Sequence, residues 1–594
     1  MPLPPHALAA LAGADVFGNG SGSHHQLRKL HTRLAVLTSA TAACGGAYLY
    51  ANQRGCDGGR LYFDGCAAVA VNGAMVALGA QFGLAEVEVV TAAVDLGAVA
   101  AYRGARASFQ AQAAGGVGAP GALAVAAWTM PEVEAPGFAL CSPTPVTPTP
   151  PLPTPVRSHS PSEEIALGPA CWLWDYLRRS GASGFVLPLS GGADSGAVAA
   201  IVGAMAGLVV RAAAAGDPGV AADARRVGGY GPGEPLGGPA SFTSRILLTA
   251  YLASATASTE ASRSRAAAVA ADVGSTHVEC AIDGLVGAAL GALSGGVGGL
   301  LASPSPSPSP SQIPQPRCRA AGGSPTEAVA LQNLQARSRM VLTFLLAQLG
   351  PWVLGEAAKV STSGATPPSP LPGAALNPAG FRLVLSASNV DEALWGYLTK
   401  YDCSAGDLNP IGGVSKTDLK AFLEWAAQPA PDGLGFPSLA AVAAAPPSAE
   451  LEPTGAGPDG DSAGNGPCPR EQTDEDDMGV TYADLATLGA ARTLARCGPA
   501  SMFAALAAGP WSGRPPAAVA ATVKRFWTAH GANRHKATTL TPAYHAEAYS
   551  PDDNRFDQRP FLYNRGWGAQ FRAIDAGVRE REEEGGGEGG AGRR

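Results

Sequence analysis

The 594-residue sequence has few charged residues, and Lys and Arg are outnumbered by Asp and Glu. Charged residues make up 15% of the chain and hydrophobic residues 46%, which excludes a globally disordered protein and leaves enough apolar material for a sizeable core. The 41 basic and 48 acidic residues give a net charge of −7. This balance argues against a nucleic-acid coat and against a polybasic membrane binder.

Cysteines are also scarce, and the sequence shows no targeting segment. Ten cysteines are too few for a disulfide scaffold, and no CxxC pairs repeat at the spacing of a zinc site. Residues 1–15 lack the basic start and the apolar core of a secretory signal. No run of about 18 uncharged apolar residues with membrane-type flanks is present. We therefore expect a cytoplasmic protein that uses neither a membrane nor a nucleic acid as its partner.

Glycine and proline are abundant, and their distribution divides the chain. The 77 glycines and 50 prolines are too many for one compact domain and collect in low-complexity segments. The predicted parts are a first domain at 1–112, a Pro/Gly-rich linker at 113–161, an α/β domain with insertions at 162–570, and a disordered tail at 571–594. Insertions expected as exposed loops cover 212–240, 303–318, 361–380 and 455–470.

The segment after residue 162 alternates short apolar runs with helical patterns. Residues 184–189 predict a strand, Ser190 to Gly192 a tight turn, and residues 193–206 a helix. Further strands are expected at 246–252, 277–282 and 382–385, and further helices at 259–273 and 326–349. Alternating strands and helices predict an α/β fold, in which a parallel sheet has helices on both faces.

The turn Ser190-Gly191-Gly192-Ala193-Asp194-Ser195 has the features of a phosphate-binding loop. Its glycines let backbone amides approach an anion, and the start of the helix adds unpaired N–H donors. A bare Gly-Gly pair before a helix is usually a plain turn, but two hydroxyls and a carboxylate in the same turn favour the phosphate site. The loop lacks the lysine of the GxxxxGK[ST] motif. A carboxylate beside phosphate requires a divalent cation, so we expect Mg²⁺.

This hexapeptide resembles the SGGxDS loop of the N-type ATP pyrophosphatases, which cleave ATP to AMP and pyrophosphate. Longer segments are similar to one family of these enzymes, the glutamine-dependent NAD synthetases. They are ALQNLQARSRM at 330–340, NVDEALWGYLTKYDC at 389–403, NPIGGVSKTDL at 409–419, NRHK at 533–536 and TPAYH at 541–545. The resemblance covers most of 162–570 and implies a Rossmann-like ATP pyrophosphatase domain.

The resemblance implies a ligase that forms a C–N bond. In this family, ATP adenylates the carboxylate of deamido-NAD with Mg²⁺ present, and ammonia derived from glutamine then converts the intermediate to NAD. The implied ATP-binding residues are Ser190, Gly191, Gly192, Asp194, Ser195, Lys416, Ser448, His535 and Lys536. Among the implied functional residues, Asp194 and Lys416 are catalytic, and Asp194 and Glu392 bind the metal.

The second substrate and the assembly are also implied by resemblance. Asn333, Arg337 and Asp407 match residues near deamido-NAD in the family. Without the family, Arg337 would be interpreted as a solvated or interhelical arginine, and Lys416 as a surface lysine. The family buries its dinucleotide site at a subunit interface, so the resemblance implies a homo-oligomer. We interpret the acidic run at 471–477 as a solvated loop without a catalytic role.

One departure from the family pattern lies at the end of a predicted strand. The family commonly has Gly followed by Ser or Thr where this chain has Ser386-Ala387-Ser388. The missing hydroxyl at Ala387 leads us to expect weaker ATP binding.

Residues 14–112 resemble the carboxyl-terminal half of a nitrilase-like glutaminase domain. The similar segments are GSGSHH at 20–25, NQRGCDG at 52–58 and YFDGC at 62–66. The family's catalytic Glu, Lys and Cys all lie before the region that matches, so we expect synthesis with free ammonia but not with glutamine. Cys44, Cys56 and Cys66 do not match the nucleophile's motif. We expect His24 and His25 to serve packing rather than metal binding, because adjacent side chains point apart on a strand.

Two alternatives to an NAD synthetase remain open. One is another ATP-pyrophosphatase amidotransferase, such as a GMP or asparagine synthetase, although Asn333, Arg337 and residues 399–402 argue against it. The other is a non-catalytic, ATP-binding regulatory protein, which would bind ATP–Mg²⁺ without releasing pyrophosphate.

Overall fold

The computed structural model describes residues 4–114, 133–134, 136–137, 146–301, 315–362, 377, 380–446, 451, 473–537, 541–547 and 564–588. The chain divides into two compact units, Met1–Glu164 and Ile165–Arg594. Each unit has its own sheet and its own buried core.

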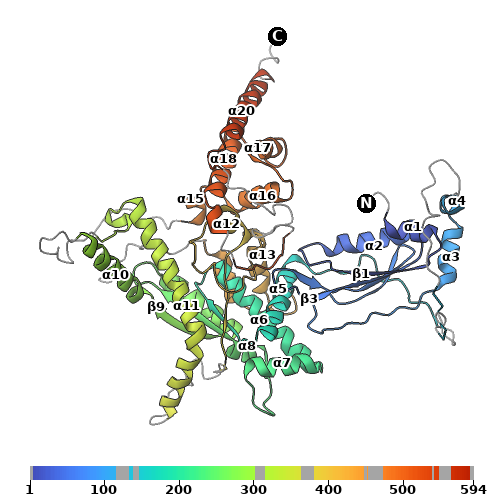
Figure 1. The fold of residues 1–594 in the computed structure, drawn as a ribbon, viewed down its shortest axis with the longest axis horizontal. Helices are drawn as coiled ribbons and strands as arrows, with labels where there is room; N and C mark the ends of the chain where they lie inside the picture. The colour runs from blue at the N-terminus through green and yellow to red at the C-terminus, as the bar shows by residue number, and fades with distance from the viewer. Residues whose placement is uncertain are drawn as a thin grey trace. The chain divides into compact units, whose positions relative to one another are not determined.

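The first unit is built on a four-stranded mixed sheet in the order β1-β2-β5-β6. Its strands are β1 (Val16–Ser21), β2 (Ala47–Asn52), β5 (Ala68–Val71) and β6 (Ala74–Leu78), and β1 runs parallel to β2 while the other pairs are antiparallel. Helix α2 (Leu30–Cys44) lies along this sheet (Figure 1). Leu37 on α2 packs into one cluster with Tyr50 and Met75. The smaller elements are α1 (Pro5–Leu11), β3 (Arg54–Cys56), β4 (Tyr62–Asp64), α3 (Leu96–Gly104) and α4 (Ala107–Ala114).

The Pro/Thr-rich segment interpreted as a linker contacts this first unit where the structure describes it. Leu152 N donates to Met75 O at 2.8 Å, and Thr149 N donates to Ala93 O at 2.9 Å. Leu152 and Val156 pack against the cluster around Tyr50. The segment is extended, as its prolines predict, and the amides of Thr149 and Leu152 pair with the domain. Most of 113–145 lies outside the described residues.

The second unit contains a four-stranded parallel sheet in the order β10-β7-β8-β9. Its strands are β7 (Phe185–Pro188), β8 (Leu247–Ala253), β9 (Thr276–Ala281) and β10 (Leu383–Val384). Leu248 packs with α11 (Pro325–Thr362) on one face, whereas the hydroxyl of Tyr251 bonds to Ser262 on α9 (Glu260–Val273) at 2.7 Å. Because alternate residues of a strand point to opposite faces, helices cover both sides of the sheet. The predicted α/β fold is confirmed.

The remaining helices pack beside this sheet or, toward the C-terminus, form a group apart from it (Figure 1). They are α5 (Pro161–Ser180), α6 (Ala193–Ala214), α7 (Pro218–Gly228), α8 (Pro239–Ile246), α10 (Asp283–Leu301), η3 (Arg319–Ala321), α12 (Val390–Trp395), α13 (Lys416–Ala426), α14 (Ser438–Ala444), α15 (Asp474–Met478), α16 (Tyr482–Thr493), α17 (Pro499–Ala508), α18 (Pro516–Ala532), α19 (Arg534–Ala537) and α20 (Gly568–Glu588). Helices α16 to α18 and α20 share a second apolar core that includes Phe526 and Trp527.

Two predictions from composition were wrong. The segment 212–240, expected as a loop, contains α7 and the start of α8. Asp217 caps α7 by accepting a hydrogen bond from Val220 N, and Val220, Ala224 and Val227 form a buried stripe. The predicted tail belongs largely to α20, whose Ile574 is fully buried in the C-terminal core. A high content of Ala and Gly does not distinguish a helix from a loop, because these small residues occur on the apolar face of a helix as well as in loops. The other three predicted insertions lie mostly or wholly outside the described residues.

Helix α6 extends beyond its predicted end at residue 206. It is 22 residues long, and among the described helices it alone is long and apolar enough to cross a membrane. In the structure, 67% of its most apolar window is buried, and it packs against α7, α8, α9 and α13. A central helix surrounded by other helices needs no polar face, which accounts for its composition.

Candidate active site

The turn between β7 and α6 lies at the carboxyl end of a parallel strand, where α/β sheets bind their ligands. Gly191 has φ +78°, and a Cβ there would lie 2.2 Å from the carbonyl oxygen of Ser262 on α9. Ser190 Oγ lies 3.0 Å from Ser195 Oγ and accepts a hydrogen bond from Gly192 N at 3.2 Å. The hydroxyls therefore hold the shape of the turn, and glycine is required for its close approach to α9.

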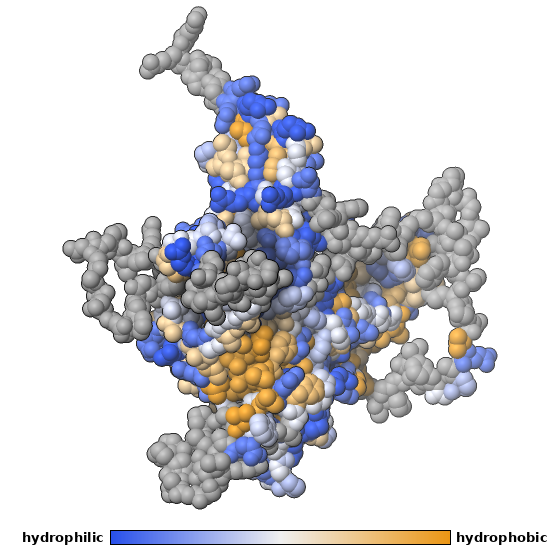
Figure 2. Space-filling model, turned by 60° about the vertical axis from the view of Figure 1, so that its left-hand side comes forward, coloured by the Kyte–Doolittle hydropathy of each residue, from blue (hydrophilic) through white to orange (hydrophobic). Residues whose placement is uncertain are grey.

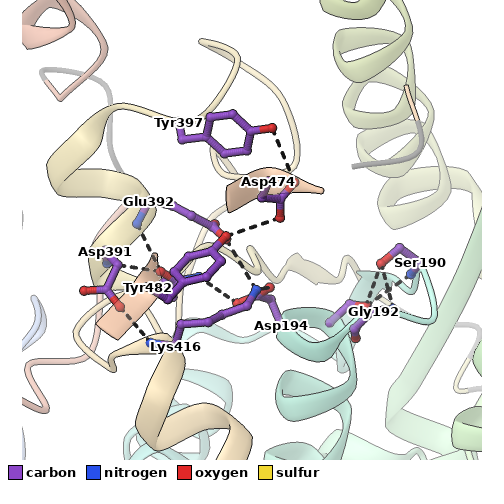
Figure 3. Close-up of polar contacts among 11 residues, drawn as sticks. Ser190, Gly192, Asp194, Asp391, Glu392, Tyr397, Lys416, Asp474 and Tyr482 are labelled. Atoms are coloured by element: carbon purple, nitrogen blue, oxygen red, sulfur yellow. Dashed lines mark hydrogen bonds and ion pairs between the residues drawn. The ribbon is translucent and has the colours of Figure 1, made fainter. Parts of the chain in front are cut away.

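Asp194, in the first turn of α6, is held by groups from two distant segments. Asn389 caps α12 by accepting from the amides of Asp391 and Glu392, and its Nδ2 donates to Asp194 Oδ1 at 2.9 Å. Lys416, the first residue of α13, forms an ion pair with Asp194, and its Nζ lies 3.4 Å from Glu392 Oε1 (Figure 3). The starts of three helices thus place two carboxylates around one ammonium group.

Part of the acidic run expected to be a solvated loop enters the same site. Asp474 is only 7% exposed. The hydroxyl of Tyr482 lies 3.2 Å from Asp474 Oδ2 and 3.1 Å from Glu392 Oε1, and the hydroxyl of Tyr397 lies 3.3 Å from Asp474 Oδ1 (Figure 3). The interpretation as a solvated loop was therefore wrong for Asp474. The sequence signal that could have indicated this burial is Thr473, which caps α15, followed by Tyr482 at the start of α16.

The electrostatics of this cluster show an excess of negative charge. Burial, reinforced by the charge of Asp194 and opposed by Lys416, raises the pKa of Glu392 to about 8. Burial also raises the pKa of Asp391 to about 7, although Lys416 N donates to its carboxylate at 2.9 Å. Burial alone would lower the pKa of Lys416, but the charges of Asp194 and Glu392 outweigh it and raise this pKa. One ammonium group does not compensate all the carboxylates.

The loop and the cluster line one cavity of about 710 Å³. Three further cations that sequence reasoning did not identify also line it, namely Arg265 on α9, Arg339 on α11 and Lys420 on α13. Arg265 Nε donates to Gly191 O at 3.0 Å, and Arg339 Nε donates to Leu252 O at 3.1 Å. Arg339 belongs to the motif at 330–340, whereas Arg265 and Lys420 lie outside the motifs quoted above, and the packing of their helices brings all three to the cavity. The cavity can receive a polyanion beside the loop.

Comparison with known proteins agrees with these features. The sequence model of the carbon-nitrogen hydrolase family matches residues 1–104, and that of the NAD synthase family matches residues 379–490. The glutamine-dependent NAD(+) synthetase of Arabidopsis thaliana is 48% identical, over 97% of this chain and 70% of the relative. The chain belongs to the glutamine-dependent NAD(+) synthetase family. The enzyme of the same name from Homo sapiens is 44% identical, over 98% of this chain and 73% of the relative.

A solved structure supports the fold of this synthetase family member. The crystal structure of a glutamine-dependent NAD(+) synthetase from Cytophaga hutchinsonii matches with a TM-score of 0.61 and 19% sequence identity. The match covers 95% of this chain and 71% of that chain. The resemblance inferred from the sequence motifs is thus confirmed for the family and for the fold.

Most of the predicted ATP-binding residues come together in the synthetase cavity, but two do not. Ser190, Gly192, Asp194, Ser195 and Lys416 line it, as does the predicted metal ligand Glu392, and Gly191 lies in the same turn. His535 is exposed, and Lys536 Nζ donates to the carbonyl oxygen of Gly396 at 2.7 Å. Both lie on the short helix α19, and neither belongs to the cavity lining. Ser448 lies outside the described residues.

The predicted deamido-NAD residues are only partly grouped. Asn333 and Arg337 lie one turn apart on α11 and contact adjacent residues: Thr399 Oγ1 donates to Asn333 Oδ1 at 2.7 Å, and Arg337 Nε donates to Lys400 O at 3.0 Å. Asp407 is exposed, and its Oδ2 accepts a hydrogen bond from Val384 N on strand β10 at 2.8 Å. The structure thus gives Asp407 a contact that supports the strand.

Cys44, Cys66 and His25 of the first unit are consistent with packing roles. Cys66 is 1% exposed, and burial raises the pKa of its thiol to about 12. Burial also raises the pKa of Cys44, so the nucleophilic thiolate is disfavoured at both positions. His25 is 1% exposed and packs edge-to-face with Phe82 at a ring separation of 4.8 Å.

Ala387 lines the cavity without a hydroxyl, which provides a test of the expected weak ATP binding. The neighbouring hydroxyls do not replace it, because Ser386 and Ser388 are buried and do not line the cavity; their Oγ atoms accept from Gly406 N and Asn409 Nδ2. We expect Ala387→Ser to lower the KM for ATP by about tenfold, because a hydrogen bond to a charged group is worth at least about 1.5 kcal/mol. Steady-state kinetics checks this, with Ser386→Ala as the variant that alters only the neighbouring hydroxyl. An unchanged KM for ATP in Ala387→Ser would show that this position does not contact ATP.

Proposed function

We propose that this chain amidates deamido-NAD to NAD, with ATP cleaved to AMP and pyrophosphate. The observation that carries the proposal is the arrangement of Lys416, Asp194 and Glu392 beside the glycine loop, in one cavity at the carboxyl end of a parallel sheet. Family membership supports the reaction class, and Asn333 with Arg337 supports a dinucleotide as the second substrate. Arginine suits this substrate because its guanidinium group can bind a phosphate through two parallel hydrogen bonds.

The residues of the cavity match the demands of this reaction. A carboxylate oxygen of deamido-NAD attacks the α-phosphorus of ATP, and pyrophosphate leaves with the electron pair of the broken P–O bond. The amides at the start of α6 would hold the pyrophosphate, while Lys416 and Arg265 would reduce the repulsion between the two anions. Ammonia then attacks the acyl carbon, loses a proton, and AMP leaves.

The carboxylate cluster fits a magnesium ion. Asp194 and Glu392 flank the single ammonium group of Lys416, and the Tyr482 hydroxyl connects Glu392 to a third carboxyl group, Asp474. Within the described residues, no group of three or more His, Cys, Asp or Glu is placed to hold a metal alone. Magnesium commonly uses one or two carboxylates together with substrate phosphates and water, so Asp194 and Glu392 would suffice. When bound, the ion would neutralise phosphate charge.

We propose free ammonia as a nitrogen source for this chain. The phosphate loop and its cavity lie within the second unit, which has its own core. Two cysteines of the first unit have raised pKa values and carry little thiolate near neutral pH. The relatives are named glutamine-dependent, so glutamine is the nitrogen source to compare.

The test is NAD formation by the purified chain from deamido-NAD and ATP–Mg²⁺, with ammonium or glutamine supplied in parallel. We expect NAD, AMP and pyrophosphate in equal amounts with ammonium, and none after magnesium is removed with EDTA. Xanthosine monophosphate and aspartate, offered in place of deamido-NAD, test the other amidotransferases. ATP binding by the folded chain without pyrophosphate release would refute the proposal in favour of a regulatory protein.

We also propose that the active form is a homo-oligomer that uses helix α11. Val341, Leu345, Leu349 and Trp352 recur every three or four residues along α11, and each is 44–60% exposed. The α10–α11 side of the unit shows an apolar patch (Figure 2). Arg337 lies one turn before this stripe on the same helix. A second copy covering the stripe would bring the dinucleotide site to the subunit interface.

A charge in this stripe tests the assembly. We expect Leu345→Asp to convert a dimer into a monomer and to raise the KM for deamido-NAD by about tenfold or more, because a buried unpaired carboxylate disrupts an apolar interface. Light scattering after size exclusion gives the mass, and Leu494→Asp, at an exposed apolar residue after α16, is the matched control. A monomeric wild type that makes NAD normally would contradict the proposal.

A further inference from the structure

The proposed reaction leaves the segment around Asp474 without a role, although this acidic residue is buried in the cavity wall. Both oxygens of its carboxylate are engaged: Oδ1 by the hydroxyl of Tyr397 and Oδ2 by the hydroxyl of Tyr482. The segment itself is fixed, because Thr473 caps α15 and Glu475 Oε1 accepts from Tyr482 N at 2.8 Å. A buried carboxylate held between two tyrosine hydroxyls limits the movement of both rings.

Tyr482 connects Asp474 to Glu392 and Lys416. Its hydroxyl lies 3.1 Å from Glu392 Oε1, the same oxygen that lies 3.4 Å from Lys416 Nζ. The ammonium group of Lys416 also stands over the Tyr482 ring, 5.1 Å from its centre. Tyr482 therefore contacts both members of the Lys416–Glu392 pair, while Asp474 fixes Tyr482 from behind (Figure 3).

The shared oxygen of Glu392 suggests how Tyr482 acts. The single hydroxyl hydrogen of Tyr482 is shared between Glu392 Oε1 and Asp474 Oδ2, and Lys416 Nζ donates to the same Glu392 oxygen, so the hydroxyl and the ammonium group compete there. Without the tyrosine hydroxyl, Lys416 would no longer have a competitor at this oxygen, and its ammonium group would be drawn toward Glu392. Its ammonium group would then be less available to Asp194 and to phosphates held by the glycine loop.

We propose that Tyr482, supported by Asp474, is a positioning residue that holds Glu392 and Lys416 in the geometry required for ATP activation. The inference rests on the proposed function and adds two residues to its machinery. Tyr397 serves as the internal comparison, because its hydroxyl contacts Asp474 and Asp477 but is not bonded to Lys416.

The experiment compares two variants that each remove one hydroxyl from Asp474. We expect Tyr482→Phe to lower kcat for NAD formation with ammonium by about tenfold, with the KM for deamido-NAD within twofold of wild type. Asp474→Asn should show a loss of the same order. Tyr397→Phe should stay within about threefold of wild type, because the donor to Glu392 remains. Equal losses in Tyr482→Phe and Tyr397→Phe would overturn the inference.

A double-mutant cycle separates positioning from general destabilisation. If Tyr482 acts through Glu392, adding Tyr482→Phe to Glu392→Gln should lower kcat by less than about twofold further. Loss of the full tenfold in both backgrounds would show that the hydroxyl acts elsewhere. Thermal unfolding of each variant verifies that it is folded, and Asp474→Asn supplies the test if Tyr482→Phe does not fold.

The failure of this inference is distinguishable from failure of the proposed function. A wild-type chain that forms no NAD refutes the function. In that case, calorimetric titration with ATP–Mg²⁺ still tests the positioning of the phosphate-facing groups. Tyr482→Phe should then weaken binding by about tenfold, and Tyr397→Phe by about threefold or less. Equal affinities in the two variants would overturn the inference there as well.

Discussion

Lys416→Met is expected to lower the rate of NAD formation by at least about 100-fold, the largest loss for any side chain of the cavity. The substitution removes the ammonium group that lies between Asp194 and Glu392 and faces the glycine loop. A fixed cation beside the phosphates stabilises the charge that develops as pyrophosphate leaves, and loss of one such donor typically costs about 100- to 1,000-fold in rate. Pyrophosphate release from ATP and deamido-NAD, with saturating ammonium, measures the effect.

A comparison with Lys420 separates a specific ion pair from general positive charge. Lys420 lies one turn further along α13 and also lines the cavity, but it is exposed. Lys420→Met changes the net charge by the same amount, and we expect it to change the rate by less than about fivefold, because an exposed charge acts through solvent. Losses of equal size in the two variants would show that the ion pair has no special role.

Gly191→Ala is expected to abolish productive ATP binding, raising the KM for ATP by at least about 30-fold, equivalent to about 2 kcal/mol. Gly191 has φ +78°, and its added Cβ would lie 2.2 Å from the backbone oxygen of Ser262. A left-handed conformation costs an L-residue about 1–2 kcal/mol, and the clash requires the loop or α9 to move. That movement displaces the amides that would hold the phosphates and the carbonyl that accepts from Arg265.

The neighbouring glycine provides the matched control. Gly192 has φ −93°, and a Cβ there would contact only Ser190 Oγ, at 3.3 Å. We therefore expect Gly191→Ala to lower the free energy of unfolding by at least about 2 kcal/mol. Gly192→Ala, in contrast, should keep the unfolding temperature within a few degrees of wild type. If Gly191→Ala binds ATP as wild type does, then the turn is not the phosphate site.

Much of the fold and part of the site could be predicted from the sequence, because the information is local. Strand, turn and helix follow one another within residues 184–214, so the apolar run and the paired glycines predict the loop and its place at the end of a strand. Asn389, Asp391 and Glu392 are likewise close in sequence, and the cap of α12 fixes their arrangement. The predictions from composition were wrong where small residues form helices, as in α7 and α20.

By itself, the sequence determined the glycine turn between β7 and α6, the family and the α/β class of the second unit. Only the tertiary structure decided which charges meet in the cavity. Asp194 and Lys416 are 222 residues apart, and Glu392 and Tyr482 are 90 apart. Arg265 and Asp474 reach the site through the packing of α9 and α15. An exposed charge and a cavity-lining charge are the same residue type in a sequence, and the difference between them arises when helices pack and remove water from around the side chain.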